Sequence, residues 1–325
     1  MKTVYIALAS LFLFISCEQK DGKRDTSFLT DSTGKINSLL VVTSNELWNG
    51  SVGEKLRDYF AAPTDGLPQQ EPLFSMTQIP PSTYSGFSRN YRTFLYVKMG
   101  DSNNFSIKKD SYAKPQLGAF ITATSEEKMM ELIDQNYEEI IRAFKAGEIK
   151  EKQRRTRLSL LPIDSLKERF GVQLEISSVY RVAAASNDFY WIRKDLKSGS
   201  TNILVYEVPL NAIGQDSTII GDIIKIRDSI GSGYLPVEDD GRFITEEAYA
   251  PYLFSSELDG KFAYETKGTW ELKDQYMAGP FVNYAVRDEA KNRYLIIEGF
   301  TYAPTVGKRD LQFELEAIIK SAKFD

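Results

Sequence analysis

Short apolar runs alternate with helical stripes in the first part of the chain. Apolar runs of the kind that form buried strands occupy residues 39–42, 94–97 and 117–121. Two stripes with helical spacing predict helices, one beginning near Ser51 and Glu54 and the other near Thr124 and Glu127, because both pairs have the spacing of a capping box. One face of the second helix carries Met129, Leu132, Ile133, Tyr137, Ile140, Ile141 and Phe144.

A charged segment follows this stripe. Six basic and two acidic residues lie between Lys145 and Arg157. We interpret the segment as a solvated helix that links two lobes, and the alternative is a basic face for anionic lipid or lipopolysaccharide. Pro162 ends the segment. We therefore predict a first α+β lobe over residues 36–160, ending in the long helix, and a second over residues 161–325.

The second lobe is richer in strand patterns. Runs with β-branched and aromatic residues cover residues 189–192, 202–208, 262–270, 281–286 and 294–300. We expect a hairpin loop at 288–292, one helix near 222–230 and another that closes the chain. Consecutive strands with short connections, followed by helices, predict an antiparallel sheet covered by helices. The predicted fold class is therefore α+β, with two lobes.

The N-terminus has the pattern of a lipoprotein signal. Lys2 precedes an apolar run over residues 4–15, which is too short to span a bilayer because a spanning helix needs about 20 residues. Ser16 and Cys17 follow, and Cys17 is the only cysteine of the chain. We expect residues 1–17 to be a signal peptide ending at a Cys17 that carries palmitate-type acyl chains. The alternative is an ordinary signal peptide in which Cys17 has no role.

Residues 18–35 are polar and predict a flexible tether, which as a random coil would span about 25 Å. Residues 18–21 resemble the signal that Bacteroidota place after the acylated cysteine to export lipoproteins to the cell surface, although any tether is polar. The expected location is the cell envelope, at the outer membrane, with the body facing the periplasm or the surface. The protein would contact the membrane through its lipid anchor.

Composition excludes several kinds of chemistry. The chain has 325 residues, no histidine and a formal net charge of −5. Without histidine or a free thiol it lacks the Ser-His-Asp and Cys-His arrangements and the usual ligands of zinc, copper, haem and iron–sulfur clusters. We therefore expect no cofactor, no metal and a function without catalysis. The acidic balance argues against nucleic acid as a partner.

Short motifs are spread over nearly all of the chain after the signal. They are residues 34–37, 46–48 with Gly50 and Gly53, 67–69, 71–74, 227–230, 268–270, 279–282, 298–300 and 302–304. With these motifs the chain resembles an uncharacterised Bacteroidota lipoprotein family, domain of unknown function 4837. The resemblance implies an envelope lipoprotein and assigns no activity. The second lobe also resembles a PsbP/Mog1-like sandwich, a fold whose members mostly bind partners.

The candidate ligand-binding residues are Trp48 and its neighbours Asn45 and Asn49. They lie in a predicted loop after a strand, where binding residues are common, and aromatic faces stack on sugar rings. The alternative is that Trp48 packs under the following helix. Trp191 and Trp270 lie inside strand patterns, and we interpret both as core residues.

Two acidic clusters are the candidates for carboxylate chemistry. Residues 238–240 hold three carboxylates before Gly241, a pattern typical of a solvated turn and able to attract a hard cation. Glu246 and Glu247 could supply the acid and base of a glycosidase. The favoured function is a non-catalytic envelope lipoprotein that binds a protein partner or a glycan. The alternative is a carboxylate-dependent glycan hydrolase.

Overall fold

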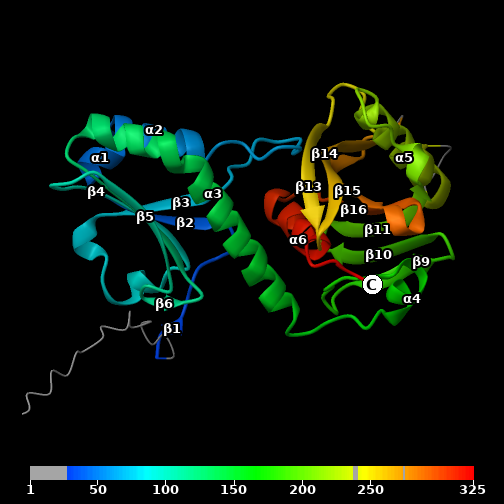
Figure 1. Cartoon of the computed structure of the whole chain (residues 1–325), viewed down its shortest axis with the longest axis horizontal. Coiled ribbons are helices and arrows are strands. Elements are labelled where there is room, and N and C mark those ends of the chain that lie inside the picture. The colour runs from blue at the N-terminus through cyan, green and yellow to red at the C-terminus, as the bar shows by residue number, and fades with distance from the viewer. Residues whose placement is uncertain (1–27, 237–240, 274) are drawn as a thin grey trace, which may run out of the picture.

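The computed structural model describes residues 28–236, 241–273 and 275–325. Two lobes lie side by side, and the long helix α3 runs from the first toward the second (Figure 1). The first lobe contains a five-stranded sheet in the order β3-β2-β4-β7-β5, in which every neighbouring pair except β5 with β7 is parallel. Its strands are β2 (Ser38–Val42), β3 (Ser75–Ile79), β4 (Thr93–Met99), β5 (Asn104–Lys109) and β7 (Leu117–Ala123).

Three helices cover one face of this sheet: α1 (Asn45–Asn49), α2 (Ser51–Phe60) and α3 (Glu126–Thr156). The predicted strands and both predicted helices are present, but the N-cap residue of each helix differs from the prediction. Gly50 is the N-cap of α2, because α1 ends there and the Gly50 N–H already bonds to the Glu46 carbonyl. Ser125 caps α3 by accepting from the Lys128 N–H. The sequence could not decide between Thr124 and Ser125 as the cap of α3, because the two are adjacent and both carry a hydroxyl group.

The charged segment after Lys145 is helical and leads toward the second lobe, as predicted, but the prediction that it is solvated is wrong in part. Helix α3 continues without a break to Thr156, and Glu148 and Glu151 within this stretch are buried. Glu148 is buried against Arg92 of the first lobe. The end of α3 also packs against α6 (Arg309–Ile319) of the second lobe, where Ile149 contacts Phe313 and Ala317. Only the far side of this part of the helix is solvated.

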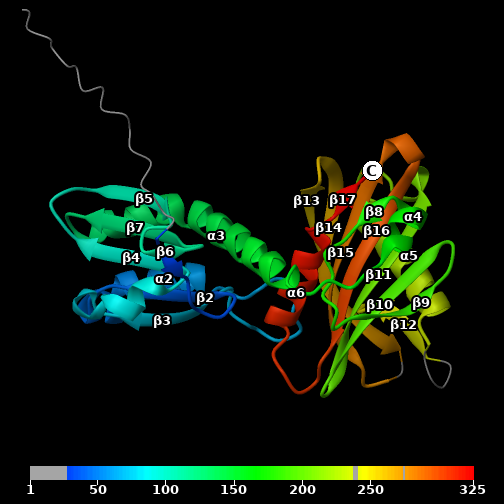
Figure 2. The same cartoon turned by 90° about the horizontal axis from the view of Figure 1, so that it is seen from below.

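The second lobe is built on one eight-stranded antiparallel sheet in the order β12-β14-β15-β16-β11-β10-β9, with β13 also paired to β14. This confirms the α+β class, and Figure 2 shows how the sheet curls. Its strands are β9 (Arg181–Ala185), β10 (Phe189–Leu196), β11 (Gly199–Pro209), β12 (Arg242–Thr245), β13 (Tyr252–Leu258), β14 (Lys261–Lys273), β15 (Ala278–Asp288) and β16 (Arg293–Tyr302).

The two faces of this sheet have separate cores. One face packs on α6 and on the short helix α4 (Asp164–Phe170). The other packs on α5 (Ile219–Tyr234), the helix predicted near residues 222–230. Two small ladders complete the fold: β1 (Thr30–Asp31) with β6 (Ala113–Lys114), and β8 (Val172–Gln173) with β17 (Lys323–Phe324). Within the described ranges, no helix is both long enough and apolar enough to cross a membrane.

Polar contacts join the lobes at the start of α6. The Glu71 carboxylate accepts from the backbone N–H groups of Lys308 at 2.6 Å and Arg309 at 3.1 Å, which are orphan donors at a helix N-terminus. Asn37 donates to Asp310 across the same interface at 3.0 Å. The motif residues before and after β2 therefore attach the first lobe to the closing helix of the second.

Candidate functional site

A cavity of about 330 Å³ opens on the α5 side of the curled sheet, where α5 no longer covers the strands. Alternating side chains of β10, β11, β14 and β16 point into it, because every second residue of a strand faces the same side. Aromatic rings dominate the lining: Trp191, Phe243, Trp270, Phe300 and Tyr302.

The pairing register explains how these residues meet. Arg193 of β10 lies opposite Asn202 of β11, and Asn202 lies opposite Phe300 of β16. In the next row, Ser200 lies opposite Tyr302. Polar and aromatic side chains thus form adjacent rows across three strands, and this mixture forms the base of the cavity.

Hydrogen bonds fix the orientation of the partly buried indole of Trp191. Its Nε1–H donates to Asn202 Oδ1 at 3.0 Å, and Asn202 Nδ2–H donates to Ser200 Oγ at 3.0 Å. Asn202 is almost completely buried, so its amide holds the ring from below. Trp270 is held in the same way, since its Nε1–H donates to the Thr301 carbonyl at 3.2 Å. The Trp191 ring is therefore preorganised for stacking.

One charged side chain, Arg193, lines the described part of the cavity. The Arg193 guanidinium lies 6.0 Å from the centre of the Trp191 ring and is paired with Asp195. Among the described residues that line the cavity there is no carboxylate, so the described lining supplies no acid or base pair. The arrangement can stack a ring and donate hydrogen bonds from Arg193, Ser200 and Tyr302.

A buried ion pair supports the wall of the cavity from the α5 side. Arg227 of α5 donates to both oxygens of Glu298 of β16, at 2.8 and 2.7 Å, and Asn283 donates to the same carboxylate at 2.9 Å. The Arg227 guanidinium also lies 3.4 Å from the centre of the Phe281 ring. Arg227 and Glu298 belong to two of the sequence motifs, and the structure shows that these motifs hold α5 on the sheet.

The ligand-binding residues predicted from the sequence lie elsewhere. Asn45, Trp48 and Asn49 form helix α1, not a loop, because the Ser44 hydroxyl caps a helical turn there by accepting from the Leu47 N–H. Trp48 packs against the first lobe's core and is covered by the Arg57 guanidinium, 4.8 Å from its ring centre. Asn45 accepts from Gln78 at 3.1 Å. Trp48 therefore packs on the core as the alternative describes, and its side chain is partly buried.

The other two tryptophans, Trp191 and Trp270, differ in how deeply they are buried. Trp270 is 2% exposed and is a core residue, as predicted. The assignment of Trp191 to the core is wrong in part, because the indole packs beside the core but also lines the cavity. Of the missed residues, Asn202 lies in a strand that the sequence predicted, while Ser200 and Tyr302 lie just beyond the predicted ends of β11 and β16. The signal that could have identified these cavity residues was the presence of polar residues on a strand face whose other positions carry aromatic residues.

The acidic candidates do not form a site in the part of the chain that is described. Glu247 is exposed and lies 3.9 Å from Lys273, while the Glu246 backbone N–H continues the pairing of β12 with β14. No group of three or more His, Cys, Asp or Glu residues that could hold a metal occurs among the described residues. Cys17, the tether up to residue 27, and residues 238–240 of the acidic turn lie outside the described residues.

The fold and the cavity define a two-lobed α+β protein with an aromatic-lined cavity in its second lobe. The chain belongs to the family of a domain of unknown function (DUF4837), whose model matches residues 159–321. Another domain of unknown function (DUF8532) matches residues 32–157. The two matched segments meet close to the predicted lobe boundary. The resemblance to the DUF4837 family is confirmed for the second lobe, while the motifs between residues 34 and 74 lie in the segment that DUF8532 matches.

No curated protein matches the chain. Among solved structures, human StAR-related lipid transfer protein 5 is similar at 6% sequence identity, covering 53% of this chain and 94% of that chain with a TM-score of 0.24. A likeness of this size carries no argument about function.

Proposed function

We propose that the protein is a lipid-anchored, non-catalytic component of the cell envelope that binds a glycan in the aromatic cavity of its second lobe. One observation carries the proposal: a ring-stacking surface centred on Trp191, held by Asn202 and edged by hydrogen-bond donors. Ligand sites commonly combine apolar walls with a few placed polar groups in this way. The carboxylates of the hydrolase alternative, Glu246 and Glu247, line none of the cavities described here.

The anchor part of the proposal rests on the sequence around Cys17. In cells given a palmitate analogue, the wild-type chain should incorporate the label and fractionate with membranes. The Cys17→Ser variant should lose the label, because the thiol is the acylation site. Equal labelling of both chains would contradict the anchor and leave the glycan site untouched.

The glycan part predicts which residue controls binding. After a glycan array has identified a ligand for the Cys17→Ser chain, calorimetry should show that Trp191→Ala weakens binding about ten-fold or more, equivalent to about 1.4 kcal/mol. Trp191→Phe should have an intermediate effect, because it keeps a ring but loses the hydrogen bond to Asn202.

The matched control is Trp48→Ala, which removes the tryptophan that the sequence favoured but that lies outside the cavity. Its affinity should stay near that of the unchanged chain. Loss of binding with Trp48→Ala alone would overturn the assignment of the cavity. Turnover of the bound glycan, abolished by Glu246→Gln or Glu247→Gln, would support the hydrolase alternative instead.

A further inference from the structure

A larger cavity, of about 520 Å³, lies in the first lobe between the second half of α3 and the edge formed by β5 and β7. Gly147 lets α3 approach β7 closely, because a Cβ there would lie only 2.5 Å from Leu117 Cδ1. The small residues Ala143 and Ala146 line the groove beside it. Ala146 and Pro115 are exposed at the mouth. The apolar walls are Ile107, Pro115, Leu117, Ala143, Ala146 and Gly147.

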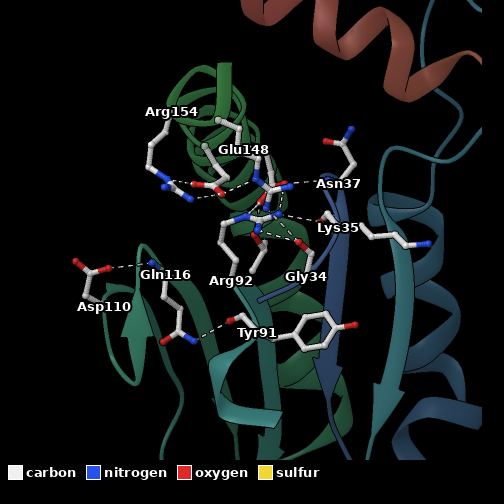
Figure 3. A network of polar contacts seen from close by, with 12 residues as sticks. Gly34, Lys35, Asn37, Tyr91, Arg92, Asp110, Gln116, Glu148 and Arg154 are labelled. Atoms are coloured by element: carbon white, nitrogen blue, oxygen red, sulfur yellow. Dashed lines mark hydrogen bonds and ion pairs between the residues drawn. The ribbon is translucent and has the colours of Figure 1, made fainter. Parts of the chain in front are cut away.

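A buried ion pair, Arg92 with Glu148, lines part of the groove, and Figure 3 shows the polar network around it. Arg92 and Glu148 are 4% and 1% exposed, and Arg92 Nε donates to Glu148 Oε1 at 2.7 Å. The carboxylate also accepts from Thr93 Oγ1 and from the Asn37 backbone N–H, both at 2.9 Å. Four hydrogen bonds saturate Glu148, so this pair supports the groove and does not attract a ligand by charge.

The remaining charges around the groove favour an anion. Arg154 is bound to Glu151 at 2.7 Å, so its charge is largely compensated. Lys109 of β5 and Lys150 of α3 both line the groove, and within the described ranges neither has an ion-pair partner. The lining as a whole carries five basic side chains and three carboxylates. Asp110 also lines the groove without an ion-pair partner among the described residues, although it accepts a hydrogen bond from the Gln116 N–H. The walls are apolar, and the unpaired charges are two ammonium groups and one carboxylate, which leaves a positive balance.

We propose that this groove binds a single-chain anionic amphiphile, with its apolar tail along Ala143, Ala146 and Leu117 and its carboxylate or phosphate head group at Lys109 and Lys150. The volume lies within the usual range for small-molecule sites, roughly 300–1,000 Å³. An apolar wall alone would accept any tail, and the two unpaired ammonium groups select the charge of the head group.

The position of the groove agrees with a lipid ligand. Strand β1 pairs with β6, and Pro115 of the groove wall directly follows β6. Residues 17–30 can reach at most about 45 Å even when fully extended. The proposed anchor at Cys17 would therefore keep the groove near the bilayer. Ligand binding in solution does not require the anchor or the glycan cavity, so it can be tested independently of both.

The test uses the Cys17→Ser chain, whose own acyl group is absent, and displacement of the fluorescent fatty acid dansylundecanoic acid. Dodecanoate and dodecyl phosphate should both displace the probe, and their relative affinities distinguish a fatty carboxylate from a lipid phosphate as the source. Dodecanol and dodecyltrimethylammonium should displace it at least about ten-fold more weakly.

Two variants separate the tail site from the head-group site. Ala146→Trp fills the mouth of the groove, and Lys109→Glu with Lys150→Glu reverses the free charge. Each should weaken probe binding about ten-fold or more while thermal unfolding stays unchanged, because these side chains are exposed. Lys225→Glu, on the exposed face of α5, is the charge control and should bind the probe like the parent chain.

Equal displacement by dodecanol and dodecanoate would overturn the proposal, because the lysines would then contribute nothing. Unchanged probe binding by Ala146→Trp would overturn it as well, since the probe would be bound elsewhere. Competition by an acidic peptide in place of the amphiphiles would show that the groove binds protein. Loss of glycan binding by Trp191→Ala with unchanged probe binding would show that the two sites are separate.

Discussion

Glu298→Gln should lower the free energy of unfolding of the second lobe by about 3–5 kcal/mol, the usual loss when one partner of a buried ion pair is removed. Arg227 and Glu298 are 2% and 1% exposed, so the neutral amide would leave a buried guanidinium without a counter-charge. Urea unfolding followed by tryptophan fluorescence measures the effect, since Trp191 and Trp270 lie in this lobe.

Two further variants make this result specific to the pair. Glu247→Gln makes the same chemical change at an exposed position and should shift stability by less than about 0.5 kcal/mol. The double variant Arg227→Met with Glu298→Gln removes the unpaired cation and keeps an acceptor for Asn283. It should be more stable than Glu298→Gln alone. If the Glu298→Gln variant were as stable as the parent chain, the ion pair of Arg227 and Glu298 would contribute nothing to stability.

Acid should weaken the contact between the lobes, and Glu314 of α6 should account for part of that effect. Its carboxylate accepts from Lys152 of α3 at 2.6 Å, from Tyr180 at 2.8 Å and also from Lys194. Burial alone would raise the pKa of Glu314, but the ammonium groups of Lys194 and Lys152 outweigh it and lower the pKa to about 2. A pKa below the unfolded value means that the carboxylate stabilises the native state.

The sign of this linkage fixes the pH window. The stabilisation is fully present above the ordinary glutamate pKa of 4.5 and is lost as the pH falls toward about 2. At about 1.4 kcal/mol per pKa unit, the contribution is roughly 3 kcal/mol. Glu314→Gln should therefore be less stable by about that amount at pH 7, with a flatter loss of stability in acid. Glu247→Gln should keep the parent profile in chemical unfolding at pH 2–7, and a parent-like profile for Glu314→Gln would contradict the assignment.

Strand and helix patterns predicted most of the second lobe because its sheet is buried on both faces. In β16, Leu295 and Ile297 face one core while Ile296 and Phe300 face the other. Such a strand must be apolar along most of its length, and its short hairpin from β15 follows from local geometry. Burial on both sides therefore left a strong local signal in the sequence.

Helix α3 shows where the pattern failed. Its apolar stripe ends at Phe144, and the charged residues that follow are typical of a solvated face. Glu148 is buried nonetheless, because Arg92, 56 residues earlier in the chain, neutralises it. A buried charge with a distant partner has the same local sequence as an exposed one, so periodicity could not distinguish them.

The sequence by itself determined the α+β class, eight of the thirteen strands in the two main sheets, the closing helix and the family, since each depends on local propensity or on short motifs. Only the tertiary structure decided which tryptophan lines a cavity. Alternation along β10 assigned Trp191 to a face of the sheet, but α5 covers only part of that face. Trp48 had polar neighbours yet is covered by Arg57 from the next helix. Exposure depends on what packs above a residue, and that is set by contacts far away in the chain.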